Sequence, residues 1–65
     1  MDIKFALQNA VALNDALRNC TEKEADALLK AEMRGGRRRA FVLRIFSRFN
    51  RMRADRERKE INAKL

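Results

Sequence analysis

The chain has 65 residues and a net charge of +7, and it contains no proline, histidine, tyrosine or tryptophan. A chain this short forms one domain at most and buries only a thin core, so helix packing gives it marginal stability. One cysteine, Cys20, excludes an internal disulfide, and the lack of histidine removes the usual metal ligands, so we expect no cofactor and no metal.

The charge is divided unevenly along the chain. Residues 1–33 hold four basic and six acidic residues, which gives −2, whereas residues 34–65 hold twelve basic and three acidic residues, which gives +9. We expect one half to fold or dock and the other to meet nucleic acid, an anionic membrane or an acidic protein. A basic surface that only aids solubility is the simpler alternative, but arginine, which suits phosphate and carboxylate, outnumbers lysine.

Residues 2–18 are predicted to form the first helix. Its seam alternates spacings of three and four, and Asp2 lies at the positive end of the helix dipole. The pattern covers fewer than three heptads, so we interpret it as one wall of a small bundle. The seam consists of Ile3, Ala6, Ala10, Leu13, Leu17 and Cys20.

A capping box marks the start of the second helix. Thr21 and Glu24 have the required spacing, and the helix is predicted to end at Met33 or Arg34. Gly35 and Gly36 follow, and we expect a turn with a left-handed glycine cap rather than a phosphate-binding loop, because no strand precedes it and no Lys-Ser follows. The inward residues are expected to be Ala25, Leu28, Leu29 and Met33.

The third helix is predicted to begin at Arg37 or Arg38 and to continue past Glu60. Its first part has one apolar face, an arc of roughly 140°, opposite a face of arginines. Burial should end near Met52, so residues 53–65 should form a charged tail that projects and frays. It should be held only by weak local ion pairs, namely Arg51–Asp55, Arg53–Glu57 and Arg56–Glu60. The apolar face consists of Phe41, Val42, Ile45, Phe46, Phe49 and Met52.

These elements predict an all-α fold: a single domain over residues 1–65 with two short helices and a long basic C-terminal helix. We expect this small domain to self-associate as a homodimer, because its core is thin. The third helix should pack on the first two through Phe41, Val42, Ile45, Phe49 and Met52, against Leu13, Leu17, Leu28 and Leu29.

An enzyme is not expected, because Ser47 has no base partner and the acids near residue 24 are explained by capping. The remaining feature is an arginine ridge about 30 Å long. We predict that it binds nucleic acid, DNA or RNA, in a salt-dependent way, with an acidic host protein as the alternative partner. The predicted binding residues are Arg37, Arg38, Arg44, Arg48, Arg51 and Arg58.

Other binding modes have less support. Asn50 alone is a weak signal for reading a base. A helix-turn-helix fits the glycine turn and the charge, but not the phenylalanine density, and the first helix offers no basic support. Insertion into a membrane surface is disfavoured, because the first two helices need the apolar face of the third as cover.

The segment TEKEADALLKAEMRGGRRRAFVLRIFSRFNRMRADRERKE resembles the small helical proteins of unassigned role in tailed bacteriophages and prophages. The resemblance covers about two-thirds of the chain and implies an accessory protein that binds host machinery. It assigns no site residue. Because the first residues do not form a signal peptide and no apolar run can span a bilayer, we expect a cytoplasmic protein, in the host cytoplasm if phage-encoded.

Overall fold

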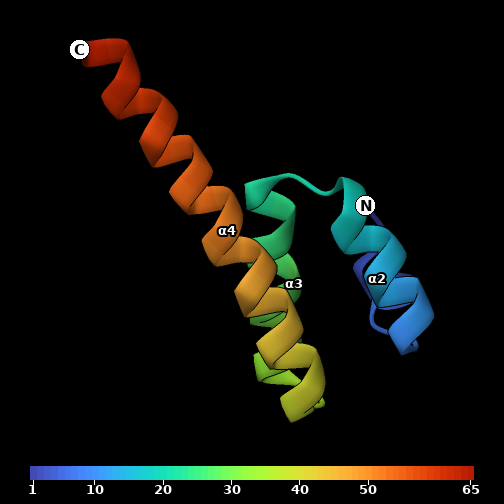
Figure 1. Ribbon diagram of the computed structural model, residues 1–65. Helices are drawn as coiled ribbons and strands as arrows, with labels where there is room; N and C mark the ends of the chain where they lie inside the picture. Colours follow the sequence, from blue (N-terminus) through green and yellow to red (C-terminus); the bar gives the residue numbers. More distant parts are fainter.

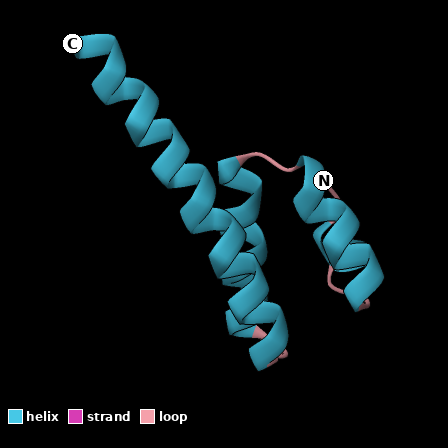
Figure 2. Ribbon diagram, in the orientation of Figure 1, coloured by secondary structure: helices cyan, strands magenta, loops and turns pink.

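The computed structural model describes all residues from Met1 to Leu65, and every regular element is a helix (Figures 1 and 2). The all-α prediction is confirmed, but there are four helices rather than three. They are α1 (Ile3–Ala6), α2 (Ala10–Asn19), α3 (Glu22–Arg34) and α4 (Arg39–Lys64).

The helices α3 and α4 form an antiparallel hairpin, and α1 and α2 lie together on one side of it (Figure 1). The far end of α4 extends well beyond its neighbours, so the molecule is elongated, with extents of 43 × 18 × 15 Å. None of the helices combines the length and the apolar character needed to cross a membrane.

The predicted first helix is interrupted, which corrects the continuous helix expected over residues 2–18. The break lies at Leu7–Asn9, between α1 and α2. Asn9 has extended backbone angles, and its side-chain Oδ1 accepts a hydrogen bond of 2.8 Å from the amide of Ala12, which makes it the N-cap of α2. Of the predicted seam, Ala10 is consequently exposed, whereas Ala6, Leu13, Leu17 and Cys20 are buried.

The helix α3 begins where the capping box places it. Thr21 Oγ1 accepts from the Glu24 amide at 3.1 Å, and the Glu24 carboxylate accepts from the Thr21 amide at 2.8 Å. This exchange lowers the pKa of Glu24, because the backbone hydrogen bond from Thr21 favours the ionised form. The prediction of a capping box is confirmed.

The turn between α3 and α4 forms at Gly35 and Gly36, but the predicted left-handed glycine is wrong. Gly35 has a φ of −108°, and the residue with positive φ is Arg37, at 48°. Gly36 is needed for close approach instead, because a Cβ there would lie 2.8 Å from Glu32 Oε2. The backbone therefore passes directly against a carboxylate.

The core joins all four helices, and α4 contributes the fully buried Ile45. The predicted packing of α4 on α2 and α3 is confirmed, with Phe41, Phe49 and Met52 partly buried around this core. Val42, which was also expected there, does not pack against the core. Two expected inward residues are largely exposed, Phe46 at 47% and Met33 at 48%. The buried apolar residues are Ala6, Leu13, Leu17, Cys20, Ala25, Leu28 and Ile45.

Every residue after Met52 is exposed, and the helix continues to Lys64, so burial ends where the sequence predicts. The expected pairs Arg53–Glu57 and Arg56–Glu60 form at 3.8 and 3.0 Å. The third expected pair, Arg51 with Asp55, is not a salt bridge. Arg56 forms a further salt bridge with Glu22 at 2.9 Å, which connects the start of the tail to the start of α3.

Candidate functional site

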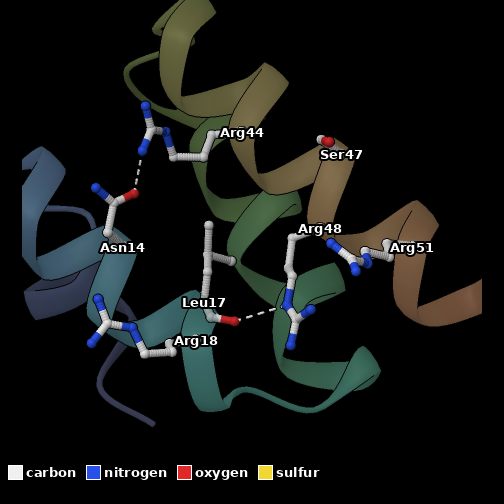
Figure 3. Close-up of a pocket in the computed structure, with 7 residues that line it drawn as sticks. All are labelled: Asn14, Leu17, Arg18, Arg44, Ser47, Arg48 and Arg51. Carbon is white, nitrogen blue, oxygen red and sulfur yellow. Dashed lines mark hydrogen bonds between the residues drawn. The ribbon is translucent and has the colours of Figure 1, made fainter.

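An open pocket of about 460 Å³ lies between α2 and α4, and it gathers four arginines (Figure 3). Three of them, Arg44, Arg48 and Arg51, follow one another on α4 at spacings of four and three residues, which places them on one side of the helix. The pocket contains no acidic side chain. Its lining residues are Asn14, Leu17, Arg18, Arg44, Ser47, Arg48 and Arg51.

Two of these arginines are held in place by neutral acceptors on α2 (Figure 3). Arg48 Nε donates to the carbonyl oxygen of Leu17 at 2.9 Å, and Arg44 Nη1 donates to Asn14 Oδ1. The Leu17 carbonyl lies in the last turn of α2, where a cation also interacts favourably with the helix dipole. Because neither acceptor is charged, the positive charge of both guanidinium groups is not compensated by these contacts. Each group also keeps several unused N–H donors.

The other two arginines of the pocket have weak or no internal partners. Arg18 lies 3.8 Å from Asp15, but both side chains are more than 70% exposed, so this pair contributes little. Arg51 takes part in no hydrogen bond and no salt bridge. Both remain available to a ligand.

Two further predicted arginines lie outside the pocket. Arg58 is two turns beyond Arg51 on the same side of α4, about 10 Å along the axis, and it is exposed. Arg37 is exposed in the turn and donates from Nε to the carbonyl oxygen of Met33 at 2.9 Å. Neither forms a salt bridge. The structure thus brings Arg44, Arg48 and Arg51 together, with Arg58 in line.

Arg38 has a different environment from the other predicted site residues. Its Nε and Nη2 donate to the Glu32 carboxylate at 3.0 and 2.9 Å, its Nη2 also donates to the carbonyl oxygen of Leu7 at 2.7 Å, and its guanidinium lies 3.6 Å from the centre of the Phe41 ring. These contacts join α1, α3 and α4. Its charge is already matched by a buried carboxylate, so the structure gives Arg38 a role in the fold.

Three lining residues, Asn14, Arg18 and Ser47, were missed at the level of sequence. The first helix was interpreted as lacking basic support, yet Arg18 of α2 lies at the pocket. A usable signal exists, because Asn14 and Arg18 are four residues apart and therefore share one face of α2. What the sequence does not reveal is that this face lies opposite the arginines of α4.

No protein-family model, curated protein or solved structure matches this chain. No group of three or more His, Cys, Asp or Glu side chains is placed to hold a metal ion.

Proposed function

We propose that this protein is a non-enzymatic binding protein that contacts nucleic acid, DNA or RNA, through the arginine side of α4. The observation that carries the proposal is the convergence of Arg44, Arg48 and Arg51 on a pocket without a carboxylate. Guanidinium groups bind phosphate oxygens through paired hydrogen bonds. The guanidinium groups of these three arginines form no salt bridge with a carboxylate of the same chain.

The contacts available favour binding that does not depend on base sequence. Arginines along one ridge address phosphates, which position a protein but carry no sequence information. Asn50, the side chain that the sequence singles out as suited to adenine, has its Oδ1 buried. Phe41 and Phe49 pack on the core, so their rings are not free to stack on bases.

A titration with charge-matched variants tests this proposal. Fluorescence anisotropy with duplex and single-stranded oligonucleotides should show binding at about 50 mM salt, with log K falling at a slope of about −3 to −4 against log salt for four phosphate contacts. The double variant Arg51→Gln/Arg58→Gln should bind about tenfold or more weakly. Absence of binding even at about 20 mM salt would refute the proposal.

The matched control is Arg34→Gln/Arg39→Gln, which removes the same charge from two arginines that form no internal salt bridge and lie off the ridge. We expect it to weaken binding by less than about threefold, because only the general field is reduced. An equal loss in both double variants would show that net charge, rather than the ridge, controls binding.

A second candidate is an accessory protein, of the kind found in phages, that binds a host protein in the host cytoplasm through an acidic or nucleic-acid-binding surface. The observation that favours it is the exposure of Leu43 at 53% and Phe46 at 47% on the same helix as the arginines. Apolar anchors beside arginine are typical of protein interfaces. Recovery of one host protein by the parent, and its loss with Phe46→Ser, would support this candidate.

We also propose that the protein self-associates as a homodimer. Eight large apolar side chains are at least 47% exposed, among them Leu43 and Phe46 on α4.

A further inference from the structure

The pocket between α2 and α4 has a property that a simple ridge of arginines lacks, because its walls come from two distant parts of the chain. The hydrogen bonds Arg44–Asn14 and Arg48–Leu17 bridge 30 and 31 residues of sequence and connect α4 to α2. Arg18 adds a fourth cation from the α2 side. A group bound there would be held from two directions rather than from one.

We propose that this pocket seats one backbone phosphate of a nucleic-acid strand, held by Arg18 from α2 and by Arg44, Arg48 and Arg51 from α4. The inference rests on the proposed function and adds the ligand group and the second wall. Arg48 keeps both terminal nitrogens after binding Leu17, and Arg44 keeps Nε and Nη2 after binding Asn14. Because these two guanidinium groups are already oriented, little side-chain entropy is lost when a phosphate binds.

The lining indicates a small anionic group rather than a whole base or an apolar side chain. Leu17 is the only hydrophobic residue of the seven, so the pocket offers little apolar surface to a base or an apolar side chain. Ser47 supplies a hydroxyl donor. The pocket is open to solvent, so a strand can enter and leave it, and Arg58 lies about 10 Å further along α4 to meet a following phosphate.

Like charges are concentrated around the pocket. Four guanidinium groups around one concavity repel each other, and no carboxylate of the lining compensates them. Arg51 forms no internal hydrogen bond or salt bridge that would explain its position by stability. A bound phosphate would relieve this repulsion.

The test uses the full chain and a fluorescent oligothymidylate of about twelve nucleotides, a length within the range that small single-strand binding sites cover. Arg18→Gln and Arg51→Gln are measured singly and together, with Arg39→Gln as the control of equal charge. We expect each pocket variant to weaken binding about tenfold and the control less than twofold. Ser47→Asp, which places a carboxylate in the pocket and removes no arginine, should weaken binding at least as much.

Double-variant coupling identifies the shared phosphate. If Arg18 and Arg51 hold the same group, the double variant loses less affinity than the product of the single losses, and its salt slope falls by about one. Two separate phosphates would give multiplying losses and a slope reduced by about two, which would overturn the proposal. An Arg18→Gln variant with the same affinity as Arg39→Gln would also overturn this proposal, and the proposed function would still stand. A parent protein that does not bind the oligonucleotide would refute both.

Discussion

At the scale of single residues, Glu32 is the only charged side chain that the fold buries, with 1% of its surface exposed. Burying a carboxylate is costly unless it is fully hydrogen-bonded. Here it accepts from the backbone amide, Nε and Nη2 of Arg38, at 2.8 to 3.0 Å. The hydrogen bond from the Arg38 amide acts at the start of α4, because Arg38 is the N-cap of this helix and its own side chain does not cap it. Glu32 therefore fixes where α4 begins.

We predict that Glu32→Gln lowers the free energy of unfolding by about 2 kcal/mol. Losing one partner of a buried ion pair costs about 3–5 kcal/mol, but Arg38 is 41% exposed and can be partly rehydrated. Urea denaturation followed by circular dichroism gives the value. The matched control is Glu57→Gln, which breaks an exposed pair and should change stability by less than about 0.5 kcal/mol.

The same carboxylate predicts a dependence of stability on pH. The hydrogen bonds from Arg38 hold the pKa of Glu32 below its ordinary value. A carboxyl with a lowered pKa in the folded state stabilises the protein above the unfolded pKa of about 4.3, and this contribution is lost as the pH falls through the folded value. In a series from pH 7 to pH 3, the melting temperature should decrease once the pH is below about 4. The decrease should be smaller in Glu32→Gln. Equal acid sensitivity in both proteins would show that other carboxylates control it.

At the scale of helices, α4 has one side in the core and another at the pocket. The burial of each apolar residue on α4 determines how much it is expected to contribute to stability. Ile45 is fully buried, Phe49 is partly buried and Phe46 is 47% exposed. We predict losses of about 3 kcal/mol for Ile45→Ala, about 2 kcal/mol for Phe49→Ala and less than 1 kcal/mol for Phe46→Ala. Urea denaturation of the three variants tests the order, and a larger loss at Phe46 than at Ile45 would contradict this placement of the helix.

Helix boundaries could be predicted where a local signal was recognised, such as the capping box at the start of α3 or the glycine pair after its end at Arg34. Thr21 and Glu24 fixed the start of α3 because the capping box is a local signal. The break before α2 is also local, but the regular apolar spacing of residues 3–20 outweighed the single asparagine at position 9. The burial of Glu32 could not be foreseen, because its partner lies six residues away across a turn whose path depends on Gly36.

The N-cap at Asn9 can be measured directly. Asn9→Ala removes the acceptor for the Ala12 amide and should destabilise the protein by about 1 kcal/mol, whereas Asn9→Asp should retain the cap. Thermal melts of both variants make the comparison. An alanine variant as stable as the parent would mean that α1 and α2 can join into the continuous helix expected from the heptad pattern.

At the scale of the whole molecule, the sequence predicted one wall of the candidate site and not the other. The arginine side of α4 follows from helical periodicity, so Arg44, Arg48, Arg51 and Arg58 were identified in advance. The opposite wall depends on how α2 packs against α4, and no pattern within either helix specifies that contact. The pocket is therefore a product of tertiary structure, which is why it includes Arg18.

At this scale, self-association and nucleic-acid binding should respond to salt in opposite directions. The net charge of +7 opposes contact between two copies, while exposed Leu43 and Phe46, three residues apart on α4, favour it. Screening the repulsion by raising the salt from about 50 to about 500 mM should increase the dimer fraction, whereas the same change weakens phosphate contacts. Sedimentation equilibrium at about 100 μM protein measures the first effect. Leu43→Ser/Phe46→Ser should reduce dimerisation, and Val11→Ser, at an exposed position of α2, should not. A parent protein that stays monomeric at the higher salt would show that these apolar side chains do not pair two copies.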